Sequence, residues 1–422
     1  MKVAILTNFM EFNPAYSLTG IVKDQIRMLK EYGNEVHLYV NEKYNDKKHP
    51  YALPEGVEVR KKVTFAHLKD YQRQSELTPD HKIVKDKFVE VLKEELKDFD
   101  FAFTHDFIFQ GWFLPYGLAC VEASHALPNL HWMHWIHSVP SGSRDWWNSP
   151  VYGPRHKLIY PNEADRIRVA EQYRGTIENV RTIPHIKDMR SWFEFSPEAC
   201  EFIKEHPGIM QADVVQVYPA SGDRLDAKNV KIVIKVFQTL KSLGKSVFLL
   251  IANQWATTVR HREQLSQDYI KFIEDCGLIM GDEVQFTSLW RPPKYEVGIR
   301  QTFLRELMQL GNLFVFPTRE ESFGLVLPEA SLSGGCMCVL NRSLTQQMEI
   351  SGMLATYFQF GSYDHDVHHD NDDNFYRDVA IITTGRMMEN ESLMTRTYMR
   401  QRYNWDNLYA RYYLPVMAAL KK

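Results

Sequence analysis

Two carboxylates stand eight positions apart, at Glu321 and Glu329, in the segment FPTREESFGLVLPEASLSGG. An apolar run typical of a buried strand precedes them, and a helix is expected to open between them. At about 1.5 Å of rise per helical residue, the two side chains lie on the order of 10 Å apart. This separation suits the two ends of an extended ligand, with Glu321 accepting hydrogen bonds from sugar hydroxyls and Glu329 from ribose hydroxyls. The alternative is that both acids only cap and decorate an exposed helix.

The turn between the two acids offers backbone N–H groups at the start of the expected helix. This turn consists of Ser322, Phe323, Gly324, Leu325 and Val326. Helix N-termini bind anions because their first N–H groups have no partner within the helix. A glycine at this place also lets a ligand approach the chain closely. The pattern therefore predicts a diphosphate site at the start of the helix.

A basic motif, Arg224 and Lys228 in ASGDRLDAKNV, follows an expected strand and precedes an expected helix. Arginine offers a planar fork of donors and lysine a point charge. The two together could stabilise the negative charge that grows on a leaving phosphate. Because exposed basic residues are common, an ordinary solvated surface is the alternative reading.

Buried-strand and helix patterns alternate along the chain, as in doubly wound α/β proteins. The expected strands cover residues 3–7, 35–40, 101–104, 130–132, 157–160, 180–183, 214–218, 246–252, 283–286, 313–317 and 337–340. The expected helices cover residues 21–32, 82–97, 164–173, 197–206, 230–243, 264–276, 295–309 and 326–333. A stretch with little strand character follows Pro184, and 422 residues are enough for two cores. We expect two Rossmann-like domains, 1–190 and 191–395, with ligands in the crevice at the carboxyl ends of their strands.

The pattern of Glu321 and Glu329, with FPT before it and EAxxxGG after it, resembles the E-x7-E signature of retaining GT-B glycosyltransferases, in particular the large family four. Other segments match in the family's order: MKVAILTN, Gly20 with the helix after it, GNEV at 33–36, YPNEADRIRVAEQY at 160–173 and VRTIP at 180–184. The resemblance implies a GT-B fold, in which two doubly wound Rossmann-like domains face a central cleft. The first domain would take the acceptor, the second the nucleotide sugar, and a C-terminal helix at 396–422 would cross back to the first.

The activity implied by the resemblance is transfer of a sugar, expected to be a hexose, from a nucleotide diphosphate donor to a hydroxyl acceptor. Retention of configuration is expected, and a UDP-sugar such as UDP-glucose is the favoured donor. An oxygen of the leaving phosphate can serve as the base. The acid and nucleophile pair of a retaining glycosidase is therefore not needed.

The resemblance also assigns roles to individual residues. The residues expected to act in catalysis are Glu321, Arg224, Lys228 and His137. The residues expected to bind the donor are Gly20, Ser322, Phe323, Gly324, Leu325, Val326 and Glu329. The acceptor-side candidates are His105, Asp106 and His134, and a structural histidine at the end of a strand is the alternative for His105.

Two patterns suggest a metal but are better explained without one. His131, His134 and His137 stand at intervals of three, which does not place all of them on one face of a strand. Asp370 and Asp372 form a DxD pattern within HDVHHDNDD, a composition typical of a solvated loop. We therefore expect a metal-independent hexosyltransferase with no cofactor beyond its nucleotide-sugar substrate.

Composition argues against several other classes of protein. A formal net charge of −3 gives no general attraction to nucleic acids or anionic membranes. Five scattered cysteines do not form a disulfide framework. The short apolar run at the start of the chain is not a secretory signal, and no apolar run approaches the roughly 20 residues that span a bilayer. These features predict a soluble cytoplasmic protein.

The sequence leaves the acceptor open. The aromatic and basic stretch 132–156, which includes Arg144, Trp146, Trp147 and Arg155, could face a glycan, a lipid-linked sugar or a hydroxymethylated base of phage DNA. The activity itself also allows different interpretations. The chain could be a phosphorylase-like or epimerising enzyme on the same scaffold, or a catalytically inactive protein that binds nucleotide sugars or carbohydrates.

Overall fold

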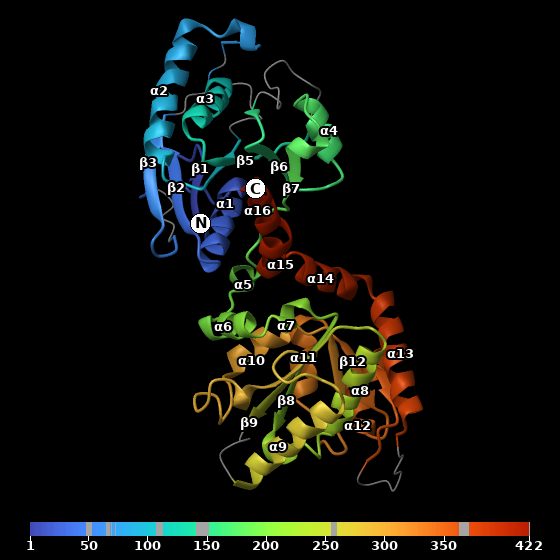
Figure 1. Ribbon diagram of the computed structural model, residues 1–422. Helices are drawn as coiled ribbons and strands as arrows, with labels where there is room; N and C mark the ends of the chain where they lie inside the picture. The colour runs from blue at the N-terminus through green and yellow to red at the C-terminus, as the bar shows by residue number, and fades with distance from the viewer. Residues whose placement is uncertain are drawn as a thin grey trace. The chain divides into compact units, whose positions relative to one another are not determined.

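The computed structural model describes residues 1–47, 53–64, 68, 70–71, 73–106, 113–140, 152–254, 260–362 and 371–421. The chain forms two compact units. Unit 1 consists of Met1–Asp188 and Trp405–Lys422, and unit 2 of Met189–Asn404. In Figure 1, unit 1 is coloured blue to green with the red C-terminal end, and unit 2 green to orange-red. Each unit carries helices on parallel strands, which confirms the expected class of two Rossmann-like α/β domains.

Unit 1 is built on a parallel sheet of seven strands in the order β3-β2-β1-β4-β5-β6-β7. Its strands are β1 (Lys2–Leu6), β2 (Glu35–Asn41), β3 (Glu58–Val63), β4 (Phe101–His105), β5 (His131–Trp135), β6 (His156–Tyr160) and β7 (Val180–Thr182). Its helices are α1 (Ser17–Glu31), α2 (Pro79–Leu96), α3 (Leu114–Ala126), α4 (Arg166–Gln172), α15 (Trp405–Leu408) and α16 (Leu414–Leu420). The strand order reverses between β1 and β4, which is the switch point where such sheets hold ligands.

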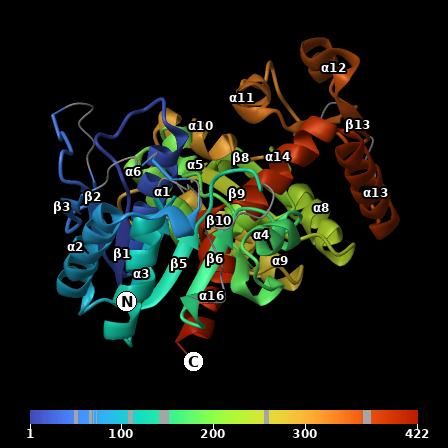
Figure 2. The same ribbon diagram turned by 90° about the horizontal axis from the view of Figure 1, so that it is seen from above.

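Helices cover both faces of this sheet because successive side chains of a strand point to opposite faces. On β4, Ala102 belongs to the same buried cluster as Leu92 of α2 and Tyr116 of α3. These two helices lie side by side (Figure 2). The next residue, Phe103, has its ring 6.4 Å from the ring of Tyr413, which follows α15. The Tyr413 hydroxyl also accepts a hydrogen bond of 2.9 Å from Gln25 of α1, so the end of the chain is tied into unit 1.

Unit 2 contains two parallel sheets of three strands, ordered β10-β9-β8 and β11-β12-β13. Its strands are β8 (Val214–Ser221), β9 (Val247–Gln254), β10 (Val284–Phe286), β11 (Leu313–Phe316), β12 (Met337–Asn341) and β13 (Thr356–Phe358). Its helices are α5 (Met189–Trp192), α6 (Pro197–Glu205), α7 (Gly208–Gln211), α8 (Val230–Ser242), α9 (Arg260–Asp275), α10 (Gln301–Met308), α11 (Val326–Gly334), α12 (Thr345–Ser351), α13 (Asp373–Glu389) and α14 (Glu391–Arg402). On β9, Leu249 and Ile251 enter one core, whereas Phe248 and Leu250 enter another.

Side-chain amides join the two sheets of unit 2 where β8 meets β11. The side chain of Gln216 donates to the Val315 carbonyl and accepts from the Val315 N–H, each over 2.9 Å. Asn312 donates its backbone N–H to the Val215 carbonyl over 3.0 Å and accepts the Val215 N–H on its side chain over 2.8 Å. Both amides are buried, where an unpaired polar group would be costly. The loops that follow β8 and β11 therefore start next to each other.

Some elements differ from the sequence-based expectation. The helix expected at 295–309 begins only at Gln301, because Gly298 adopts a φ of +138°, which no helix contains. Strand β3 was not expected at all, since its residues are mostly charged and only Val63 is buried. Charged residues are common on edge strands, where they prevent pairing with other chains. By contrast, Ser196 caps α6 as expected, accepting a hydrogen bond of 3.3 Å from the Ala199 N–H.

Candidate functional site

The loops after β8 and β11 hold each other through backbone and side-chain hydrogen bonds. The Arg319 N–H donates to the Ala227 carbonyl over 3.0 Å, and the Thr318 hydroxyl donates to the same carbonyl over 3.3 Å. In the other direction, the Asn229 side chain donates to the Pro317 carbonyl over 3.0 Å. Thr318 and Asn229 are buried, so these bonds fix the two loops in one register. This register brings the basic motif and the first acid of the E-x7-E pattern together.

Lys228 and Glu321 form an ion pair where the two loops meet. Their side chains are only 17 % and 15 % exposed, and Lys228 Nζ lies 5.4 Å from the centre of the Phe316 ring. The Gln346 side chain donates to the Glu321 backbone carbonyl over 2.5 Å. A charge this well buried needs a partner of opposite sign. A ligand that binds here must therefore join this pair or exchange one of its members.

Arg224 forms a second ion pair, with Glu320, at an Nη2–Oε1 distance of 2.6 Å. Both side chains are 49 % exposed. Exposed pairs of this kind contribute about 0–1 kcal/mol to stability. Arg224 can therefore exchange Glu320 for a phosphate group at little cost, whereas the Lys228 pair is held more firmly.

Gly324 keeps the Glu321 side chain in place. It adopts a φ of +80°, a conformation that favours glycine. A Cβ atom at this position would lie 3.1 Å from Glu321 Cγ and 3.2 Å from Phe316 Cε1. Such contacts are tighter than ordinary packing, so any side chain here would displace Glu321 or the Phe316 ring. The absence of a side chain at Gly324 thus lets Glu321 keep its position and also lets a ligand approach the backbone.

The start of α11 is exposed. Ser322, Phe323 and Leu325 all lie at the surface, and the helix begins at Val326. The Ser322 N–H donates to Glu321 Oε1 over 3.2 Å, which holds the acid against the turn. The first N–H groups of a helix have no intrahelical partner, but here the Leu327 N–H donates to the Gly324 carbonyl over 2.9 Å and Pro328 has no N–H. Val326 is therefore the residue in the first turn of α11 that can offer an N–H group to an anion.

Glu329 lies in the first turn of α11 and lines a hollow of about 360 Å³. Thr302, Arg305 and Met308 of α10 line the same hollow. Its size falls in the range of small-molecule sites. Glu321 is not part of this lining, so the two acids face different surroundings.

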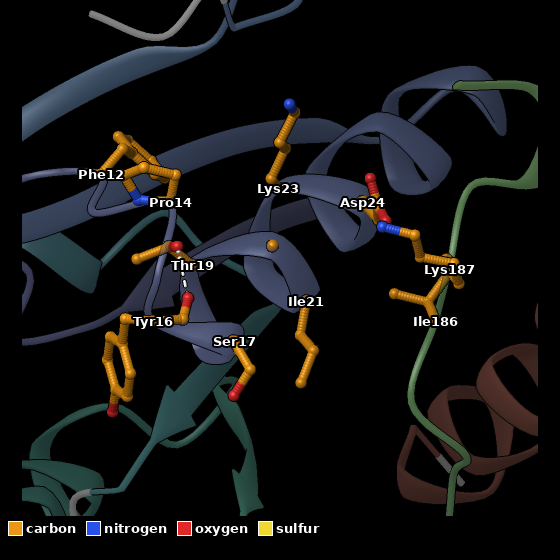
Figure 3. A pocket seen from close by; sticks show the side chains of 11 residues that line it. Phe12, Pro14, Tyr16, Ser17, Thr19, Ile21, Lys23, Asp24, Ile186 and Lys187 are labelled. Atoms are coloured by element: carbon orange, nitrogen blue, oxygen red, sulfur yellow. Dashed lines mark hydrogen bonds between the residues drawn. The ribbon is translucent and has the colours of Figure 1, made fainter. Parts of the chain in front are cut away.

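In unit 1, Gly20 lies in α1 and lines a hollow of about 640 Å³ (Figure 3). Phe12 and Pro14 line it from the loop before the helix, and Lys187 lines it from the end of the first stretch of unit 1, Met1–Asp188. A Cβ atom on Gly20 would have no heavy atom within 4 Å. The glycine is therefore not required by packing and leaves open space above the start of α1.

A chain of hydrogen bonds runs through the histidines at the ends of β4 and β5. His105 Nε2 donates to the Gln25 side-chain oxygen over 3.1 Å, and His137 Nε2 then donates to His105 Nδ1 over 2.9 Å. Burial lowers the pKa of His105 well below its ordinary value and that of His137 to about 3. Both rings are therefore neutral at physiological pH. His137 Nδ1 is a buried acceptor without a hydrogen-bond partner among the described residues.

Asp106 follows β4 in a left-handed conformation, with φ at +62°. Burial raises the pKa of its carboxyl group to about 6, although the backbone N–H of His137 donates a hydrogen bond to it and opposes the shift. One of its oxygens, Oδ1, is buried and has no partner among the residues described. A carboxyl group with this pKa can accept and release a proton near neutral pH.

His134 has a different environment from the other two histidine candidates. It is buried in β5, with Nδ1 bonded to the Thr104 hydroxyl over 2.7 Å and Nε2 to His156 Nδ1 over 2.9 Å. Both ring nitrogens are therefore engaged inside the sheet. A ligand could bond to either nitrogen only in exchange for one of these partners, and the acceptor-side role of His134 remains a prediction.

Some expected features fall on parts of the chain outside the described residues. These are Arg144, Trp146 and Trp147 of the aromatic stretch and Asp370 of the DxD pattern. Within the described residues, no group of three His, Cys, Asp or Glu side chains is arranged to hold a metal ion. No helix in that part of the chain is both long and apolar enough to cross a membrane.

Sequence reasoning missed three residues that position the expected ones. Glu320 pairs with Arg224, and its place beside Glu321 was the only signal for it. Gln346 lies 25 positions from Glu321, and Gln25 lies 80 positions from His105. Such distant pairs follow from the tertiary fold, so no local spacing could have revealed them.

No protein-family model matches the sequence, and no curated protein matches it. Solved structures match it over nearly the whole chain. The HepE protein of Anabaena, solved with UDP, is 16 % identical over 99 % of this chain and 100 % of its own, with a TM-score of 0.33. A glycosyltransferase from Rickettsia africae is 10 % identical over 100 % and 98 %, with a TM-score of 0.36. The sucrose-phosphate synthase of Thermosynechococcus elongatus is 16 % identical over 99 % of both chains, with a TM-score of 0.34.

Proposed function

We propose that the protein is a retaining glycosyltransferase that moves a hexose from a UDP-sugar to a hydroxyl acceptor. The observation that carries this proposal is the Lys228–Glu321 ion pair at the junction of two interlocked loops, with the Arg224–Glu320 pair next to it. Both cations and one carboxylate belong to the motifs that resemble family-four enzymes. The two interlocked loops together thus offer positive charge for a diphosphate and a carboxylate for sugar hydroxyls.

In the proposed reaction, the bond between the sugar C1 and the β-phosphate oxygen breaks, and its electron pair stays on that oxygen. Arg224 releases Glu320 and binds the diphosphate, while Lys228 and the Val326 N–H at the start of α11 support the charge that develops. The acceptor oxygen attacks C1 from the face that the nucleotide leaves. Its proton passes to the leaving phosphate oxygen. Because these groups meet the charge of the diphosphate, the proposal requires no metal ion.

Glu321 and Glu329 have separate roles in this proposal. Glu321 accepts hydrogen bonds from the sugar hydroxyls, and its pairing with Lys228 holds it in place. Glu329 accepts hydrogen bonds from the ribose at the hollow beside α10, whose volume of about 360 Å³ suits a nucleoside.

In unit 1, the roles predicted for Gly20, His105, Asp106 and His137 remain predictions. The unpartnered Nδ1 atom of His137 supports its role, because a neutral ring nitrogen can accept a hydrogen bond from a sugar hydroxyl. The open space at Gly20 supports close approach of a ligand to the chain there.

Hydrolysis of the donor without acceptor tests the proposal, since it needs no knowledge of the acceptor. The full-length protein would be incubated with UDP-, GDP- and ADP-hexoses, and free nucleotide measured over time. We expect slow turnover of the UDP-sugar, strongly impaired by Arg224→Ala. Arg300→Ala is the matched control, because Arg300 also pairs with a glutamate, Glu198, over 2.9 Å. Turnover of no donor, or equal turnover in both variants, would contradict the proposal.

A further inference from the structure

A second hollow of unit 2, of about 700 Å³, includes none of the residues assigned to the sugar donor. It lies where α8 meets α9 and α13, three helices that are neighbours in Figure 1. The loops before α8 and after β11 contribute Asp226 and Arg319 to its wall. The site is therefore close in sequence to Lys228 and Glu321 but has its own lining.

Among the described residues, the lining of this hollow contains more basic than acidic side chains. Lys231, Lys235 and Arg319 line it, against the single carboxylate of Asp226 among the lining residues described. That carboxylate already accepts a hydrogen bond of 2.8 Å from the Tyr269 hydroxyl. In the described part of the chain, neither lysine lies within ion-pair distance of a carboxylate. Two lysines one turn apart on a helix repel each other, and a bound anion would relieve this repulsion.

Aromatic rings hold the two ammonium groups and leave apolar surface beside them. Lys231 Nζ lies 5.2 Å from the centre of the Tyr269 ring and 5.8 Å from that of Phe272. Lys235 Nζ lies 5.1 Å from the Tyr376 ring. Cation–π contacts of this kind fix the ammonium groups without neutralising them. The cations are therefore positioned in advance but still able to bind an anion.

We propose that this hollow binds a phosphorylated sugar at a site separate from the donor site. The phosphate would contact Lys231 and Lys235, which supply charge-assisted hydrogen bonds. The sugar ring would lie against the rings of Tyr269 and Tyr376, and its hydroxyls would reach the polar side chains of the same wall. A phosphate ester carries about −1.5 to −2 charges near pH 7, which matches the charge of the two lysines.

Isothermal titration of the full-length protein tests this inference, with glucose 6-phosphate as the probe and glucose and inorganic phosphate as comparators. We expect glucose 6-phosphate to bind more tightly than either comparator. The double variant Lys231→Gln and Lys235→Gln should weaken this binding at least tenfold. Lys271→Gln is the matched control, because Lys271 is an exposed lysine of α9 that lies outside the lining. This variant should bind the probe as the wild type does.

The variant Glu321→Gln separates this site from the donor site, since it should lose donor turnover and keep binding of glucose 6-phosphate. Undiminished binding in the lysine double variant, or loss of binding in Glu321→Gln, would overturn the inference. So would binding of inorganic phosphate as tight as that of the sugar phosphate. Circular dichroism checks that each variant is folded, and the single variant Lys235→Gln replaces the double variant if that one is not.

Discussion

Two regions follow the carboxyl ends of parallel strands but treat charge in opposite ways. The first is the loop pair of unit 2, which consists of the loops after β8 and β11. The second is the histidine cluster of unit 1, which consists of His105, Asp106 and His137. In the loop pair, Lys228 and Arg224 each form an ion pair with a glutamate. In the cluster, burial lowers the pKa values of His105 and His137 and raises that of Asp106. The first region keeps its charges by pairing them, and the second removes them by burial. A site of the first kind suits phosphate, and one of the second kind suits neutral hydroxyls.

Removing the acid of the loop pair should have the largest effect on activity. Glu321→Ala deletes the proposed sugar contact and leaves Lys228 without its partner. We expect turnover of the UDP-sugar to fall about 100- to 1,000-fold, the scale seen when one preorganised polar group is lost. Glu274→Ala, on the exposed side of α9, should leave turnover unchanged. Equal activity in these two variants would show that the contrast between the regions does not concern catalysis.

The buried acid of the histidine cluster should make the free energy of unfolding depend on pH. The pKa of Asp106 is raised to about 6 by burial, so the folded protein holds this proton more tightly than the unfolded chain does. As pH rises from about 4 to about 7, Asp106 must ionise inside the protein, and its contribution to stability falls by up to about 3 kcal/mol. Asp106→Asn should therefore gain stability relative to wild type over this range.

Urea unfolding at both ends of this pH range measures the effect. Asp100→Asn is the control of opposite sign, because a hydrogen bond from Lys421 lowers the pKa of Asp100 despite partial burial. The Asp100 contribution should be lost as pH falls. If the free-energy difference between Asp106→Asn and wild type were independent of pH, the buried acid would not be the titrating group.

The glycine of the loop pair should show whether Glu321 depends on its position. Gly324→Ala would place a Cβ atom against Glu321 and Phe316 in addition to straining the backbone. Gly244 has a similar φ, +83° against +80°, but a Cβ there would meet nothing within 4 Å. Both alanine variants should lose about 1–3 kcal/mol of stability. Only Gly324→Ala should also lose turnover. Equal turnover in the two variants would show that the action of Glu321 does not depend on Gly324.

The smallest effect is expected from releasing the exposed cation of the loop pair. Glu320→Gln frees Arg224 from a pair worth about 0–1 kcal/mol, so UDP should bind up to about fivefold more tightly. Glu198→Gln frees Arg300 in the same way and should leave UDP binding unchanged. Titration calorimetry distinguishes the two. Weaker binding in Glu320→Gln would mean that Glu320 itself contacts the ligand.

The fold was predictable where side-chain pattern and burial agree. Strands such as β9, with alternate residues in two cores, read as continuous apolar runs in the sequence. Strand β3 was missed because an edge strand needs few apolar residues. Its backbone pairing with β2 holds it in the sheet, and this pairing leaves no apolar pattern in the sequence. The start of α10 was misplaced because the turn at Gly298 lies inside a stretch of helix-like composition.

The candidate site was predictable only as far as its motifs are local. Glu321 and Lys228 could be named because each belongs to a strand–loop–helix segment with its own spacing. Their pairing could not be foreseen, because it depends on the bonds between the loops at Ala227 and Pro317. His134 was predicted as an acceptor-side candidate from the resemblance, and its spacing gave no sign of how deeply it is buried. The partners that bury it, Thr104 and His156, come from neighbouring strands.

Titration calorimetry with UDP tests the central claim most directly, because that claim is that the loops after β8 and β11 hold the diphosphate. The comparison is between the wild type and the double variant Arg224→Gln and Lys228→Gln, with both proteins shown to be folded by circular dichroism. We predict that the wild type binds UDP and that the double variant binds it at least 100-fold more weakly. Equal affinity in the two proteins would contradict the account.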